Sequence, residues 1–221
     1  MNHKQARTPY LADLYERYLD DQNADGFVVK VAHRYTVGTL QRLLAGHPRR
    51  EVRRAAALAL GFLADYQSNH ALGCALLDDD RTVRMIAENG IRMVWTRTGT
   101  EEERQKLGLV ARLNAAQHYK EAIRRATELI EKAPCLAEAW HQRAVAYFHL
   151  QQYAEAVRDC HEALEINPYH FPAATNMGQA YLELGNQVSA LESFRRALRL
   201  NQDLEAVRAQ VVRLTRMVED R

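Results

Sequence analysis

Glycine and proline are scarce in this chain, with 10 glycines and 5 prolines among 221 residues. Because these two residue types dominate turns and interrupt helices, their scarcity excludes a fold with much loop. Hydrophobic residues make up 47% and charged residues 26% of the sequence, which is typical of a folded protein rather than a disordered one. The chain is long enough for one or two domains with a sizeable core.

Long apolar runs, paired cysteines and a strong net charge are also missing. The most apolar stretch, residues 55–64, is far shorter than the roughly 20 residues that span a bilayer, and the N-terminus has no apolar run typical of a signal sequence. The three cysteines are odd in number, which favours reduced thiols over a disulfide framework. A formal charge of +2 is too small to indicate nucleic acid or an anionic membrane. We therefore expect a cytoplasmic protein that does not bind membranes.

The second half contains a repeat with a period of 34 residues. Asn167-Pro168 marks the end of a helix, since proline lacks an N–H and disfavours a helical residue before it, and Ala133-Pro134 and Asn201-Gln202 lie 34 residues to either side. Each unit has the pattern of two helices joined by a tight turn. Equivalent positions are filled by Ala122, Ala156 and Ala190; by Ala126, Cys160 and Phe194; and by Val110, Ala144 and Gly178.

These residues and their period resemble the tetratricopeptide repeat (TPR) family. The second unit carries the pattern at Trp140, Ala144, Tyr147, Ala156, Ala163 and Pro168, and the third at Gly178, Tyr181, Gly185, Ala190, Phe194 and Ala197. The first unit departs from it, with Lys106 in the tryptophan slot and Val110 in the small-residue slot. We predict three repeats over about 103–202, opened by a capping box at Thr100 and Glu103. A terminal capping helix follows, with Leu204, Val207, Val211, Leu214 and Val218 on its apolar face.

The first half has a different helical rhythm. Val52-Arg53 and Val83-Arg84 lie 31 residues apart, each at the start of an Ala-rich or apolar helix after a short one, and this pattern resembles HEAT-like repeats. The predicted fold is all-α, an α-solenoid of antiparallel helix pairs. Its predicted parts are an N-terminal helical cap (1–33), HEAT-like repeats (34–100), and three TPRs with a capping helix (101–221).

Residues 20–27 contain the one pattern that suggests calcium. Asp21, Asn23 and Asp25 precede Gly26 at EF-hand spacing, but Ala32 stands where the closing carboxylate is needed. We therefore expect an Asx-rich turn in which Gly26 supplies a positive φ. Just before it, Thr8-Pro9 is expected to open a helix.

Catalytic and metal-binding signatures are missing elsewhere in the sequence. His141 and His149 are eight residues apart, about 12 Å along a helix, and the adjacent Cys160 and His161 point to different faces. The sequence has no Cys-x-x-Cys motif, no Gly-rich phosphate loop and no nucleophile elbow. We expect no enzyme activity, no cofactor and no metal.

One basic cluster offers an alternative function. Arg49, Arg50, Arg53 and Arg54 could bind phosphates as a nucleic-acid patch. Arg53 and Arg84 also occupy the slot in which HEAT-like repeats carry a structural arginine. Asp78, Asp79 and Asp80 dilute the positive field, and aromatic residues for base stacking are scarce there. Nucleic acid is the second choice of partner.

The resemblance to TPRs implies that the first helix of each pair lines a concave groove that holds a peptide. The groove candidates are Leu107, Ala111, Asn114, Glu138, His141, Gln142, Val145, Phe148, His149, Thr175, Asn176, Gln179, Leu182 and Glu183. Family members that clamp a C-terminal carboxylate use Lys, Arg and Asn at positions that here hold Leu107, Ala111, Gln142, Pro172 and Asn176. We therefore predict a protein-binding scaffold for a neutral, partly apolar ligand. Phe148 would be the anchor, and His141, Gln142 and Asn176 would bond the ligand backbone.

Overall fold

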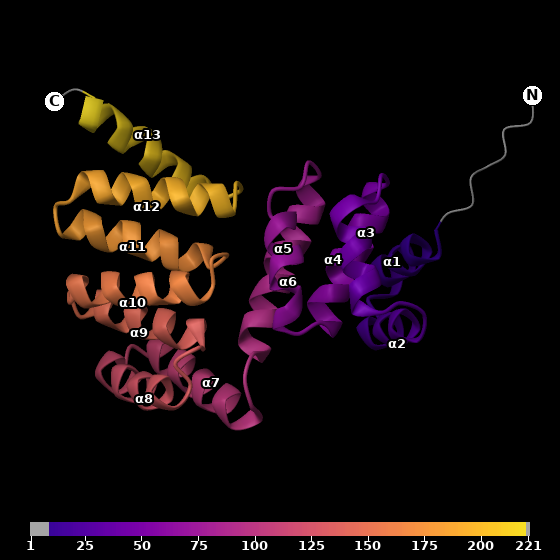
Figure 1. Ribbon diagram of the computed structural model, residues 1–221, viewed down its shortest axis with the longest axis horizontal. Coiled ribbons are helices and arrows are strands. Elements are labelled where there is room, and N and C mark those ends of the chain that lie inside the picture. The colour runs from indigo at the N-terminus through magenta and orange to yellow at the C-terminus, as the bar shows by residue number, and fades with distance from the viewer. Residues whose placement is uncertain (1–8, 220–221) are drawn as a thin grey trace, which may run out of the picture. The chain divides into compact units, whose positions relative to one another are not determined.

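Every regular element in the described part of the chain is a helix (Figure 1). The computed structural model describes residues 9–219, with side chains as far as Met217, so Thr8 and the side chain of Val218 lie outside it. The predicted all-α fold class is confirmed. The chain forms two compact units, Met1–Val94 and Trp95–Arg221, and the boundary falls inside helix α6 (Arg81–Arg97).

The first unit is built around the Ala-rich helix α4. Its helices are α1 (Tyr10–Asp21), α2 (Ala24–Arg34), α3 (Val37–Gly46), α4 (Arg50–Leu63), the short 3-10 helix η1 (Tyr66–Ser68), α5 (Asn69–Ala75) and most of α6. Small side chains let α4 and α6 approach closely. A Cβ atom added to Gly61 would lie 2.9 Å from the Cα of Gly90, so neither glycine has room for a side chain unless the helices shift.

The N-terminal turn corrects one expectation. Gly26 does not supply a positive φ, because it lies in the first turn of α2, where its N–H donates to the side chain of Asn23 (2.8 Å). The left-handed residue is Gln22, which ends α1 with a φ of 54°. An N-cap asparagine therefore starts the helix two residues earlier than an Asx turn centred on glycine would allow.

The 31-residue register of the first unit recurs as a physical contact. The Arg53 guanidinium donates to the carbonyls of His47 (3.1 Å) and Pro48 (3.5 Å). The Arg84 guanidinium makes the same bonds to the carbonyls of Asp78 (2.9 Å) and Asp79 (3.3 Å). Each arginine thus binds the turn that precedes its own helix, as a structural arginine of a repeat would. The HEAT-like assignment itself stays a prediction.

The second unit is a stack of helix pairs, an α-solenoid. Its helices are α7 (Glu101–Ala115), α8 (Tyr119–Lys132), α9 (Ala137–His149), α10 (Tyr153–Ile166), α11 (Phe171–Glu183), α12 (Gln187–Leu200) and α13 (Glu205–Glu219). Consecutive helices pack on one another from α7 to α13, and Figure 1 shows α9 to α13 in order. The predicted capping box at Thr100 and Glu103 opens α7, and α10 ends just before Asn167-Pro168.

The turn inside each helix pair repeats with the same backbone shape. Gln117 (φ 62°), Gln151 (φ 61°) and Gly185 (φ 73°) all adopt the left-handed conformation, and they are spaced by 34 residues. A left-handed residue after a helix lets the chain reverse within a few residues. The three pairs α7–α8, α9–α10 and α11–α12 therefore share one geometry, even though only the third uses glycine.

Core volumes are balanced between the two helices of each pair. From the first pair to the third, the first helix contributes Val110, Ala144 and Gly178, while the second contributes Ala126, Cys160 and Phe194. As one column shrinks, the other grows. A Cβ atom on Gly178 would lie 2.6 Å from the Phe194 ring, so this glycine makes room for an aromatic side chain.

A buried ion pair ties the middle pair to its neighbour. The Arg143 guanidinium on α9 donates to both carboxylate oxygens of Asp159 on α10 (2.7 and 2.9 Å) and to the Thr127 hydroxyl on α8 (2.9 Å). The same guanidinium lies 5.0 Å from the centre of the Trp140 ring. Such a bidentate, stacked arrangement suits arginine and not lysine.

Candidate functional site: one face of helices α7, α9 and α11

The predicted groove residues all lie on the first helices of the three pairs, but they differ in exposure. Ala111, His149 and Gln179 are exposed. Six others are half-buried, namely Asn114, Gln142, Val145, Phe148, Asn176 and Leu182. Leu107 and His141 are buried, and Leu107 packs in a core cluster with Leu129 and Ile130. These last two side chains are therefore not open to a ligand in this structure.

A chain of side-chain hydrogen bonds connects the three helices. The Asn114 amide donates to the Gln142 side-chain oxygen (2.9 Å), and the Gln142 amide donates to Oε1 of Glu138 (2.8 Å). On the other side, the Asn176 amide lies 3.1 Å from Nε2 of His141. The polar residues predicted to bond a ligand backbone thus bond one another. Their spare capacity is limited to atoms such as Oδ1 of Asn114, which has no partner.

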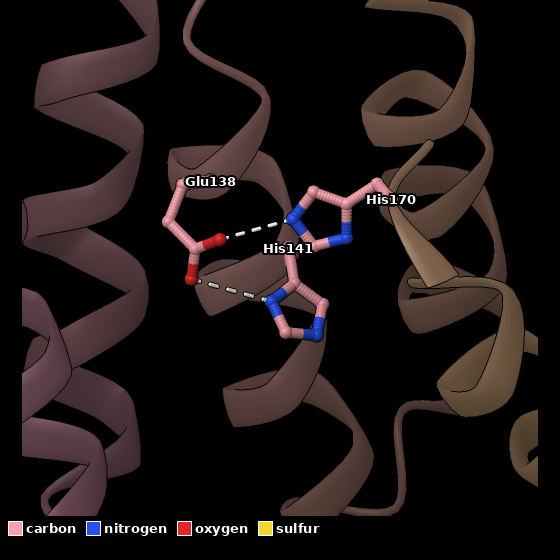
Figure 2. Close-up of side chains that lie close together, drawn as sticks. All are labelled: Glu138, His141 and His170. Atoms are coloured by element: carbon pink, nitrogen blue, oxygen red, sulfur yellow. Dashed lines mark hydrogen bonds and ion pairs between the residues drawn. The ribbon is translucent and has the colours of Figure 1, made fainter. Parts of the chain in front are cut away.

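Glu138 is the centre of this network. Its Oε2 lies 2.9 Å from Nε2 of His170, and its Oε1 lies 3.4 Å from Nδ1 of His141. Figure 2 shows the two imidazoles converging on the carboxylate, with Glu138 and His141 on one helix and His170 just before the next. The Glu138 side chain is 14% exposed and the His170 side chain 0% exposed. Sequence reasoning missed His170 because it compared only histidines within one helix.

The hydrogen bonds define which ring nitrogens carry protons. Nδ1 of His170 accepts from the Ala173 N–H (3.2 Å), so the proton sits on Nε2 and points to Glu138. Burial lowers the pKa of His170, which keeps the ring neutral at neutral pH. Burial alone would raise the pKa of Glu138, but the hydrogen bonds from His141 and His170 hold it well below its usual range. The cluster is therefore a buried carboxylate that is held by neutral donors.

Aromatic side chains gather at one end of α9. The rings of Tyr119 and His149 stack with centroids 4.7 Å apart, and Phe148 makes edge contacts with His149 (5.9 Å) and Tyr153 (5.4 Å). Phe148 is half-buried, so part of its ring faces solvent. This cluster provides the largest apolar contact among the predicted groove residues.

The predicted basic patch of the first unit is largely neutralised. Arg53 pairs with Asp78 through two bonds of 2.8 Å and also contacts Asp79. Arg54 pairs with Asp80 through bonds of 2.8 and 2.6 Å. Glu51 lies against the remaining two arginines, Arg49 and Arg50. A phosphate backbone would have to compete with these carboxylates for the same guanidinium groups.

Comparison with known families decides the nature of the second unit. Residues 137–170 and 171–204 each match the profile of the tetratricopeptide repeat. This chain contains tetratricopeptide repeats. The two matches coincide with the helix pairs α9–α10 and α11–α12, so the face described above belongs to the first helices of TPRs. The pair α7–α8 shares their geometry, and its assignment as a third repeat stays a prediction. A search of curated protein sequences gives no match.

Solved structures show the same fold. The first TPR of Spaghetti (RPAP3), bound to the HSP90 peptide SRMEEVD, is 21% identical with a TM-score of 0.52, over 55% of this chain and 96% of that one. The first TPR domain of the human RPAP3 protein is 22% identical with a TM-score of 0.50, over 53% of this chain and 93% of that one. At these identities the likeness concerns the fold alone. Among the helices described, none is long and apolar enough to cross a bilayer.

Proposed function

We propose that the TPR region is a non-catalytic scaffold that binds a peptide segment of a partner protein along the face of α7, α9 and α11. The observation that carries the proposal is the family match at 137–204, together with the polar and aromatic residues that this face presents. TPR stacks expose such a surface because each helix pair buries only its other sides against its neighbours. The three free cysteines fit a reducing compartment such as the cytoplasm.

The chemistry of the face favours a neutral, partly apolar ligand. The Spaghetti TPR structure contains a peptide that ends in acidic residues. Here Ala111, Gln142, Pro172 and Asn176 occupy the positions of a carboxylate clamp and provide no cation. The Glu138 carboxylate would also repel an acidic chain end. Binding would therefore rest on the half-buried apolar side chains Val145, Phe148 and Leu182.

Selection from a phage-displayed random peptide library tests this proposal. Peptides enriched on the wild-type chain should bind Phe148→Ala at least about tenfold more weakly, because truncating an aromatic anchor commonly removes more than 1 kcal/mol. Val188→Ala is the matched control, since Val188 is a 66% exposed apolar residue on α12, a second helix. Peptides that bind Phe148→Ala as well as wild type, or that require a terminal carboxylate, would contradict the proposed site.

Two further assignments belong to this proposal. We propose that residues 34–94 form a HEAT-like pair that supports the stack, since Arg53 and Arg84 bind their own preceding turns. Nucleic-acid binding through Arg49, Arg50, Arg53 and Arg54 is the alternative function, and the ion pairs of Arg53 and Arg54 with three aspartates argue against it.

A further inference from the structure

Glu138, His141 and His170 form a compact set of metal-ligating groups. One donor atom from each residue lies within 4.8 Å of the other two. The closest pairs are Oε2 of Glu138 with Nε2 of His170 (2.9 Å) and Oε1 of Glu138 with Nδ1 of His141 (3.4 Å). Ligands on one metal ion lie at about these separations, since Zn–N and Zn–O bonds are about 2.0–2.2 Å long. Figure 2 shows that the three groups face one another.

The surroundings hold these groups in place. The His170 ring stacks on Trp95, with centroids 4.6 Å apart and an angle of 12° between the planes. Gln142 donates to Glu138, and the Asn176 amide meets the ring nitrogen of His141 that faces away from the carboxylate. Partners of this kind orient the ligands of metal sites. Both histidines are buried and Glu138 is partly exposed, so the set is shielded but reachable.

Coordination requires both rings to change tautomer, and the structure allows it. When Nδ1 of His141 binds a metal, the proton moves to Nε2, where the Asn176 amide can turn its oxygen to accept it. When Nε2 of His170 binds, the proton moves to Nδ1 and the bond from the Ala173 N–H is lost. That N–H also donates to the His170 carbonyl (3.0 Å), so it keeps an acceptor. The loss is then one capping interaction, typically about 1 kcal/mol.

We propose that Glu138, His141 and His170 bind one divalent transition-metal ion of the Zn²⁺ class at the junction of the second and third repeats. Two imidazoles and one carboxylate are the ligands such ions accept in open sites, and a further coordination position remains for water or a partner side chain. The sequence-based expectation of no metal considered His141 with His149 and did not include His170. The proposal stands independently of peptide binding.

Calorimetric titration of the tag-free, chelator-treated chain with ZnCl₂ tests the site. Wild type should bind one equivalent. His170→Asn should bind at least about tenfold more weakly, because it removes a ligand while asparagine still caps the helix at Ala173. Glu138→Gln should weaken binding similarly. His161→Asn is the control, since His161 is exposed on α10, and it should bind like wild type.

Cobalt gives an independent readout of the ligand geometry. Co²⁺ added to the wild-type chain should produce visible d–d absorption that His170→Asn and Glu138→Gln lose and His161→Asn keeps. Circular dichroism of each variant checks that the helices remain. The proposal is overturned if wild type binds neither ion, which would make the cluster a hydrogen-bond network alone. It is equally overturned if a folded His170→Asn variant keeps wild-type affinity.

Discussion

Single carboxylates fix both units of this protein at the residue scale. Glu138 accepts hydrogen bonds from Gln142, His141 and His170 and so connects two repeats. In the first unit, Asp80 plays a comparable part, because it pairs with Arg54 on α4 and also caps α6 by accepting from the Val83 N–H (2.9 Å). Each carboxylate must be ionised to do this, so each ties the fold to pH.

Asp80→Asn should show this dependence. The Arg54 hydrogen bonds lower the pKa of Asp80 to about 2, below its usual value near 4. A lowered pKa means that the stabilisation is present above about pH 4 and is lost as the pH falls through about 2. Asparagine keeps the cap but removes the charge, so the variant should be about 1–2 kcal/mol less stable at pH 7. The gap should shrink toward pH 2, as measured by urea unfolding at several pH values.

Asp79→Asn provides the control for this prediction. The Asp79 side chain is 87% exposed, so its substitution should change stability by less than about 0.5 kcal/mol at any pH. An equal loss for Asp80→Asn at pH 7 and pH 2 would show that the Arg54–Asp80 pair contributes no pH-dependent stability.

The residue scale also shows where sequence reasoning stopped. Asp80 as a cap and Thr100 with Glu103 as a capping box were predictable, because each involves neighbours within one helical turn. The contact of Glu138 with His170 spans 32 residues. The 34-residue register contained a signal for it, since His170 falls in the slot of Leu136, the residue that starts α9. Residues at repeat starts meet across adjacent repeats, and the search for histidine pairs did not use that rule.

At the element scale, the helix pairs are defined by how their first helices end. Gln117, Gln151 and Gly185 close α7, α9 and α11 in the left-handed conformation. The glycine was recognisable as a turn, and the 34-residue period pointed to the same position in the other pairs. That glutamine adopts a strained φ there could not be predicted from propensity. The surrounding helices fix the chain direction, and the residue must follow.

Glycine at these two positions should stabilise the protein. A non-glycine residue in the left-handed region costs roughly 1–2 kcal/mol, and the greater freedom of glycine in the unfolded chain offsets part of the gain. Gln117→Gly and Gln151→Gly should therefore each add about 0.5–1 kcal/mol to the free energy of unfolding, measured by chemical denaturation. Gln152→Gly is the control, because Gln152 has an ordinary φ of −88°. A gain at Gln152, or none at Gln117 and Gln151, would contradict the strain argument.

For the molecule as a whole, the stack in the second unit has its own logic of stability. Each helix pair contacts mainly its neighbours, so stability is close to a sum of local terms and terms between adjacent repeats. The last pair is covered by α13, whose Val207 and Leu214 are buried in a core cluster with Phe194 and Ala197. The alternating apolar spacing of this helix made its capping role predictable. Its outer face carries Val212, which is 49% exposed.

Leu214→Ala should destabilise the end of the stack more than its middle. The Leu214 side chain is 1% exposed, and truncating such a leucine typically costs about 2–4 kcal/mol. Because coupling in a repeat stack acts between neighbours, hydrogen exchange should accelerate most in α11 and α12 and least in α8 and α9. Val212→Ala, on the exposed face of the same helix, should change stability by less than about 0.5 kcal/mol. Equal acceleration in all helices from α7 to α12 would instead mean that the stack unfolds as one cooperative unit, and the nearest-neighbour account would be wrong.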